Sequence, residues 1–220
     1  MTGPVTRRPT PDPPRTPPDP RPSVAGVDGC RTGWVVATDA GLEVVGRFAD
    51  VLRLVDGVVA VDMPIGLPVP GTRRACDVAA RAALGPRRSS VFPAPSREAL
   101  GAASFEAVTG LSIQAWNLVP KIREVDDAWE PRVHEVSPEL AFAVLAGAPM
   151  ACPKRSPAGR DERLAALGLA APPRLRGAAP DDVLDALACL RTAHRLAAGT
   201  ALALGDATVD ARGRPMTIHA

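Results

Sequence analysis

The sequence predicts an α/β protein built on one mixed sheet with helices on both faces. Three observations support this prediction: three short apolar segments joined by tight turns come first, apolar strands and helical segments then alternate, and a long helical pattern follows near the end. The 220 residues are 46% apolar and 23% charged, which is typical of a protein with a hydrophobic core. This length favours one folded domain, which we place at residues 24–220.

Apolar segments bounded by glycine, proline and aspartate define the expected strands, which are residues 24–28, 34–39, 42–48, 58–62, 132–138 and 215–220. The first three are separated by short Gly-containing turns, which predicts an antiparallel meander. The fourth, VVAVD, is apolar up to its final aspartate, as expected of a strand covered on both faces.

Helical patterns fill most of the remaining chain, and Pro/Gly-rich segments separate them. The segment 181–199 has the clearest pattern, and the segment 72–84 ends at Gly85, a common helix stop. Further helices are expected at residues 49–55, 97–108, 111–129, 138–147 and 161–168. Loops are expected at residues 63–71, 86–95 and 151–160, where prolines and glycines exclude a helix interior.

Residues 1–23 contain nine prolines and no apolar periodicity, which predicts a solvated tail, with a proline-motif ligand as the alternative. No apolar run is long enough to cross a membrane, and no secretion signal is evident. The four cysteines are scattered without a CxxC pair. This pattern disfavours a structural zinc site and predicts reduced thiols in the cytoplasm.

The charge distribution limits the partners that the protein can bind. The net charge is +2, and residues 1–23 account for all of it with four arginines and two aspartates. The neutral remainder lacks the basic surface of proteins that bind through many phosphate contacts. Aromatic residues make up only 3% of the chain, which disfavours stacking platforms for single-stranded nucleic acid.

Two aspartates each end an apolar strand and begin a turn. Asp28 follows the first strand and Asp62 the fourth. Ligand-binding groups gather beyond strand ends in such sheets, so the two carboxylates could share Mg²⁺ if the strands are neighbours. Each aspartate could equally cap its own turn through hydrogen bonds to the backbone. Both interpretations remain open at this point.

Further acids lie in the last helix and the fifth strand. Helical periodicity puts Val183, Leu187, Leu190 and His194 on the core-facing stripe, with Asp182, Asp185 and Cys189 roughly opposite. In one interpretation these aspartates are exposed to solvent and stabilised by the helix dipole. In the other, the start of the helix meets the strand ends, and the aspartates complete a metal site. Glu135 shares a strand face with Val133, which predicts a buried carboxylate that needs a partner or a metal. Glu139 is expected to be a surface acid in the first turn of its helix.

Several carboxylates around divalent ions are suited to phosphodiester hydrolysis, and such chemistry needs no Ser, Cys or His nucleophile. We find no convincing nucleophile of that kind, and the GCRTGW turn lacks the lysine of a phosphate-binding P-loop. The segments RRSS (87–90) and PKRSPAGR (153–160) could hold phosphate or could be ordinary solvated loops. Lys121 and Lys154 are the only lysines.

The segments GVDGCRTGW, VDMPIGLP, LGPRRSSVFPAP, LSIQAWNLVPKIREVD, VHEVSPELAF and DDVLDALACL occur in this order. Together they resemble the predicted nucleases of domain-of-unknown-function family 429, from about Val24 to the C-terminus. The resemblance implies a ribonuclease H-like fold, with a mixed five-stranded sheet flanked by helices, and the predicted strands and helices share its element order. It also implies similarity to the Holliday-junction-resolvase group, in which acids on the first strand, the fourth strand and the terminal helix bind metal.

Carried over to this chain, the resemblance implies metal ligation by Asp28, Asp62 and Asp185, with Asp182 or Glu135 in support. It implies Mg²⁺ or Mn²⁺ as cofactor and nucleic acid, either RNA or DNA, as substrate. Substrate phosphates are expected to contact residues in the matching motifs, namely Arg31, Arg87, Arg88, Lys121 and Lys154. The neutral charge of residues 24–220 disfavours a duplex substrate. The alternatives are a non-catalytic binding or scaffold protein and, least favoured, an ATP-dependent phosphotransferase.

Overall fold

The computed structural model describes residues 21–220, so the expected tail lies outside the described residues except for its last three positions. These last positions contact the turn before the fourth strand. Arg21 pairs with Asp56 at 2.8 Å, and the Val58 N–H donates to the Ser23 carbonyl at 2.9 Å. Residues 21–23 therefore lie against the folded chain.

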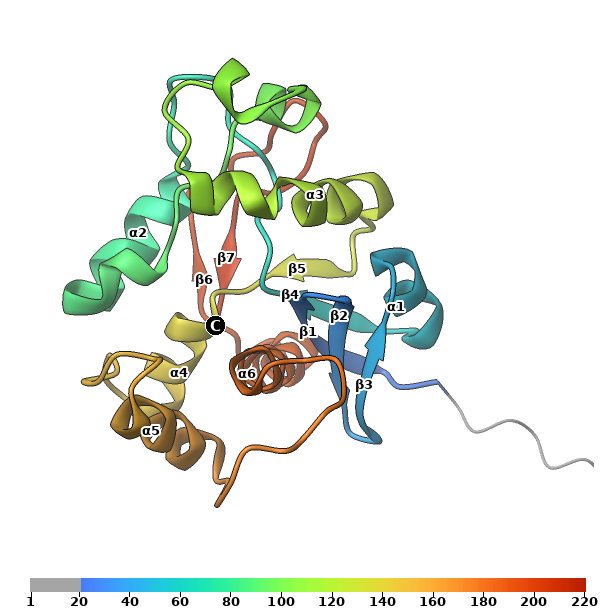
Figure 1. Cartoon of the computed structure of the whole chain (residues 1–220), viewed down its shortest axis with the longest axis vertical. Helices are drawn as coiled ribbons and strands as arrows, with labels where there is room; N and C mark the ends of the chain where they lie inside the picture. The colour runs from blue at the N-terminus through green and yellow to red at the C-terminus, as the bar shows by residue number, and fades with distance from the viewer. Residues whose placement is uncertain (1–20) are drawn as a thin grey trace, which may run out of the picture.

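A five-stranded mixed sheet forms the centre of the structure and confirms the predicted α/β class (Figure 1). Its order is β3-β2-β1-β4-β5, with β1–β2 and β2–β3 antiparallel and β1–β4 and β4–β5 parallel. The strands are β1 (Val24–Cys30), β2 (Gly33–Thr38), β3 (Gly41–Val45), β4 (Val58–Val61) and β5 (Val133–Glu135). All five strands overlap segments that the sequence predicts to be strands.

The sheet separates two hydrophobic cores, and alternate side chains of β2 enter different cores. Trp34 and Val36 belong to the core beneath α1 (Phe48–Leu54) and α3 (Ile113–Ala128). Val35 and Ala37 belong to the core on the opposite face, which contains residues of the other four helices. These are α2 (Ala75–Leu84), α4 (Pro138–Ala146), α5 (Pro157–Leu167) and α6 (Pro180–Ala197).

Helix α6 packs directly on β1, and a glycine in the strand permits the close approach. A Cβ atom at Gly26 would lie 2.0 Å from the Leu190 nitrogen and 2.1 Å from the Ala186 oxygen. Helix α6 also contacts α4 and α5, so more than one of its sides is buried.

The predicted orientation of α6 is therefore wrong in part. His194 is exposed and Leu187 is partly exposed, although the periodicity places both toward the core. Asp185 and Cys189 are buried instead, together with Val183 and Leu190. The single-stripe pattern fails here because the helix is covered by the sheet on one side and by helices on another.

Short 3₁₀ helices replace parts of the expected pattern. The expected loop at 86–95 begins with η1 (Gly85–Ser90), and the expected helix at 97–108 is divided into η2 (Arg97–Gly101) and η3 (Phe105–Ala107). Helix α5 begins at Pro157, four residues earlier than predicted. The Ser156 hydroxyl accepts the Gly159 N–H at 3.0 Å, and Pro157 occupies the first turn, so a normal helix start was overlooked.

The C-terminal segment forms a small second sheet of β6 (Ala203–Leu204) and β7 (Ile218–His219). The strand expected at 215–220 is thus present but shorter, and its partner β6 was not predicted. His219 also forms a parallel bridge with Val136, directly after β5. Within residues 21–220, no helix combines the length and the apolar character needed to cross a membrane.

Candidate metal centre

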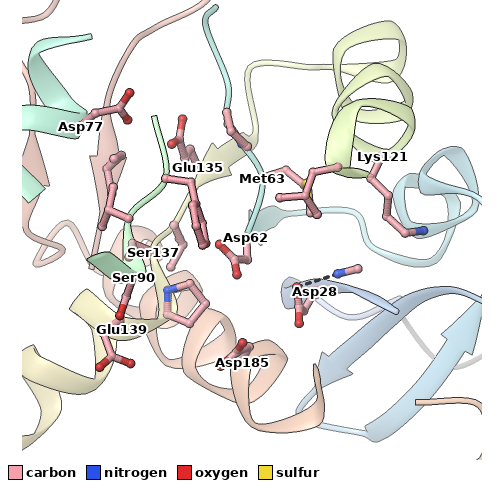
Figure 2. A pocket seen from close by; sticks show the side chains of 18 of the residues that line it. Asp28, Asp62, Met63, Asp77, Ser90, Lys121, Glu135, Ser137, Glu139 and Asp185 are labelled. Atoms are coloured by element: carbon pink, nitrogen blue, oxygen red, sulfur yellow. Dashed lines mark hydrogen bonds between the residues drawn. The ribbon is translucent and has the colours of Figure 1, made fainter. Parts of the chain in front are cut away.

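A cleft of about 510 Å³ opens at the ends of β1 and β4, and three of the four aspartates that line it lie together at these strand ends (Figure 2). Asp28 is part of β1, and Asp62 directly follows β4. The two strands are parallel with Val27 opposite Val61, and the Asp62 N–H donates to the Val27 carbonyl at 3.0 Å. This register brings the two carboxylates to the same edge of the sheet, as the strand-end pattern predicts if the strands are neighbours.

Asp185 reaches the same point from the second turn of α6. The close packing of this helix on Gly26 sets the depth at which its side chains meet the strand ends. Asp28, Asp62 and Asp185, hereafter the carboxylate triad, each offer an oxygen, and these three oxygens lie within 4.8 Å of one another. A single cation could therefore contact all three residues.

Burial makes ionisation of the triad unfavourable. Burial raises the pKa of Asp28 well above its usual value of 3.8, and the nearby charges of Asp62 and Asp185 raise it further. Burial, followed by the charge of Asp185, raises the pKa of Asp62 to about 8. Burial also raises the pKa of Asp185 to about 6, although Lys154 opposes the shift. If all three carboxylates were ionised, the triad would thus hold more negative charge than its surroundings neutralise.

The hydrogen bonds of the triad leave oxygen atoms available. The Gly29 N–H donates to Asp28 Oδ1 at 2.7 Å, and Lys154 Nζ pairs with Asp185 Oδ2. The other Asp185 oxygen, Oδ1, is buried and has no hydrogen-bond partner among the described residues. Three hard oxygen donors, one of them buried without a partner, match the ligand preference of Mg²⁺ or Mn²⁺. The residues present therefore fit a divalent cation.

Only some of the five residues predicted to bind phosphate lie at the cleft. Lys121 and Lys154 line the cleft, and Lys121 Nζ lies 4.4 Å from the centre of the Trp34 ring. Arg87 donates to Glu139 at 3.2 Å, and Glu139 lines the cleft. Arg31 and Arg88 are exposed and are not among the residues that line it.

Two other predicted acids have structural partners. The Asp182 carboxylate accepts the Ala179 N–H at 3.0 Å and caps the start of α6, and it does not line the cleft. Glu135 does line the cleft, where Arg74 donates to both of its oxygens and the Ile65 N–H donates at 2.7 Å. Burial raises the pKa of Glu135, whereas the charge of Arg74 lowers it.

Arg74 is the main feature of the cleft that the sequence analysis missed. Its guanidinium is buried and pairs with both Glu135 and Asp77. It also donates to the carbonyls of Ile65 and Gly66, in the loop that follows Asp62. The three-residue spacing of Arg74 and Asp77 was a visible sign of a local ion pair.

Glu139 differs from its expected role as a surface acid. It is 6% exposed, and the buried Arg163 donates to both of its carboxylate oxygens at 2.6 Å. The prediction from its position in the first helical turn is wrong because α5 covers this side of α4 and contributes the arginine.

The fold and the cleft define an α/β protein with a buried carboxylate site that could hold a metal ion. The chain matches the family described as "Protein of unknown function (DUF429)" over residues 26–209, and it belongs to this family. The resemblance found in the sequence is confirmed at the level of the family. Neither the curated proteins nor the solved structures gave a match to the chain.

Proposed function

We propose that this protein is a divalent-metal-dependent nuclease with a ribonuclease H-like fold. The observation that supports it is the convergence of three carboxylates, two buried and one half-buried, from β1, the end of β4 and α6 on one point of the cleft. The sheet order β3-β2-β1-β4-β5, with a helix packed across β1, agrees with that fold.

Asp28, Asp62 and Asp185 would hold the metal, which we propose is Mg²⁺ or Mn²⁺. When bound, such an ion supplies charge neutralisation at the phosphate and makes water a better nucleophile. Asp28 is held in place by the Gly29 N–H, and Asp185 by the packing of α6 on Gly26. Glu135 and Arg74 secure the loop that carries Asp62 into the cleft.

The remaining charges favour a substrate phosphate in this cleft. The Lys121 side chain packs beside Gly29, one residue after Asp28, and its ammonium could donate to a phosphate oxygen. Two of the triad carboxylates that line the cleft are almost fully buried, with Asp28 7% and Asp185 5% exposed. A flexible strand or strand end reaches such a depth more easily than a duplex does, and this agrees with the neutral charge of residues 24–220.

The test compares the full chain with Asp28→Asn and with Asp127→Asn, which alters an exposed aspartate on α3. Mn²⁺ binding is measured by calorimetry, and cleavage is measured on single- and double-stranded RNA and DNA. We expect Asp28→Asn to lose metal-dependent cleavage by about 100-fold or more, because it removes a ligand while keeping the oxygen that accepts the Gly29 N–H. Asp127→Asn is expected to match the unaltered protein.

Two outcomes would contradict the proposal. Undiminished cleavage by a folded Asp28→Asn protein would remove the triad from the chemistry. Absence of millimolar Mn²⁺ or Mg²⁺ binding, with no cleavage of any of the four substrates, would favour a binding or scaffold protein that uses the same fold.

A further inference from the structure

Lys154 brings a positive charge into the carboxylate triad from the loop between α4 and α5. Its ammonium pairs with Asp185 Oδ2, and its side chain is 32% exposed. Burial lowers the pKa of Lys154, but the charges of Asp185, Asp28 and Asp62 outweigh this effect and raise it above its usual value. Lys154 thus pairs directly with Asp185 and lines the same cleft as Asp28 and Asp62.

The loop that carries Lys154 is well anchored, so the position of this lysine is a property of the fold. The Glu162 carboxylate accepts the Ala151 and Cys152 N–H groups at 2.7 and 3.0 Å. The Pro153 carbonyl accepts the Ser156 hydroxyl at 2.8 Å.

Tight packing on the following helix fixes the same loop a second time. A Cβ atom at Gly159 would lie 2.0 Å from the Pro153 oxygen, so only glycine permits this contact of α5 with the loop. The loop is therefore held from both of its ends.

The Lys154 ammonium and a divalent ion would compete for the negative charge of the triad carboxylates. Asp185 Oδ2 is taken by Lys154, which leaves the buried Oδ1 of this residue, and within residues 21–220 this atom has no hydrogen-bond partner. An ion that contacts all three residues would also lie close to the ammonium, and like charges repel strongly where water is excluded.

We propose that Lys154 is an internal cation that neutralises the carboxylate triad until a divalent metal displaces it from Asp185. This inference rests on the proposed function, because it assumes that the triad binds metal. It implies that metal affinity is set by competition with a residue of the chain itself. It also implies that the displaced ammonium becomes available to a substrate phosphate in the cleft.

The first test measures Mn²⁺ affinity by calorimetry for the full chain, for Lys154→Met and for Arg155→Met. Arg155 is the matched control because it is an exposed cation next to Lys154 in the same loop. We expect Lys154→Met to bind Mn²⁺ at least 10-fold more tightly, and Arg155→Met to stay within threefold of the unaltered protein. Equal or weaker binding by a folded Lys154→Met protein would overturn the proposal.

A second measurement needs no variant and applies even if Lys154→Met does not fold. The chain has only two lysines, so reductive methylation can be followed at each by peptide mass spectrometry. We expect Mn²⁺ to accelerate methylation of Lys154 at least fivefold and to leave Lys121 within twofold. A rate at Lys154 that does not rise, in a protein shown to bind Mn²⁺, would overturn displacement while leaving the nuclease proposal intact. If the unaltered protein binds no Mn²⁺, both proposals fail.

Discussion

Two groups of buried acids line the same cleft, but they are neutralised differently. One is the carboxylate triad, and the other consists of Asp77 and Glu135 around Arg74, hereafter the arginine cluster. Apart from the half-buried Asp62, their exposures are almost equal: 7% for Asp28 and 5% for Asp185, against 4% for Asp77 and 6% for Glu135. Burial alone therefore does not distinguish a structural acid from a candidate metal ligand.

The hydrogen bonds do distinguish the two groups. Every carboxylate oxygen of the arginine cluster accepts at least one bond, from Arg74 or from the N–H groups of Ile65 and Ala94. In the triad, one lysine pairs with Asp185 alone, and Asp185 Oδ1 has no partner among the described residues. The arginine cluster is complete as it stands, whereas the triad would be completed by an added cation.

The largest expected effect follows from removing the charge that completes the arginine cluster. Arg74→Met leaves Asp77 and Glu135 buried without a counter-charge and should lower the free energy of unfolding by about 3–5 kcal/mol. Urea denaturation measures this loss. Arg73→Met alters the exposed neighbouring arginine and should stay within about 0.5 kcal/mol. Equal losses in the two variants would mean that the buried pairing does not stabilise the fold.

A smaller change in the free energy of unfolding is expected from the triad as the pH changes. Here stability is lost because a carboxyl group loses its proton, and not because a counter-charge is removed. The pKa of Asp62 is about 8 in the folded protein and near 3.8 in the unfolded chain. Between these values the folded state holds a proton that the unfolded state has lost. This contribution to stability is fully present below about pH 4 and is lost as the pH rises through 8.

The measurement is the free energy of unfolding without added metal, from pH 4 to pH 8. Asp62→Asn lacks the titration, so its stability relative to the unaltered protein should increase across this range. The expected increase is about 2–3 kcal/mol, about half of what the full pKa difference implies, because Asp62 is half-buried and solvent screens part of the effect. Asp127→Asn should run parallel to the unaltered protein. A constant difference between the Asp62→Asn and unaltered proteins would show that Asp62 titrates normally and is well solvated.

The sequence predicted the sheet and two members of the triad for a physical reason. Asp28 and Asp62 each come at the end of a short apolar segment. A strand followed by a turn depends on neighbouring residues only, so the local sequence is enough to predict it. The parallel pairing of β1 with β4 then places the two aspartates together without further information. The small sheet was predicted only in part, because the two-residue strand β6 has too few residues to show a pattern.

The counter-charges could not be predicted from the sequence because they come from distant positions. Arg74 and Glu135 are 61 residues apart, and Lys154 and Asp185 are 31 apart. The buried side of α6 was assigned wrongly for a related reason. Periodicity identifies one apolar stripe, but Asp185 faces a site that only the packing of the helix on β1 creates. From the residues, its place in the triad was only the alternative interpretation, and the family resemblance made it the expected one.

The smallest expected change in stability comes from Asp182, which caps α6, and it tests whether this residue is distinct from the triad. Asp182→Ala removes the bond to the Ala179 N–H and should lower the free energy of unfolding by about 0.5–1 kcal/mol. Mn²⁺ affinity should change less than threefold, because Asp182 affects the pKa of Asp28 only through its charge. Chemical denaturation and calorimetry measure the two quantities.

Asp181→Ala is the matched control, since Asp181 lies in the same first turn and favours the helix dipole. Its loss of stability should be about 0.3 kcal/mol, below that of Asp182→Ala, because a dipole contact is weaker than a capping hydrogen bond. A tenfold loss of Mn²⁺ affinity confined to Asp182→Ala would instead place Asp182 among the metal ligands. In that case the start of α6, and not only its second turn, would have to reach the triad when metal binds.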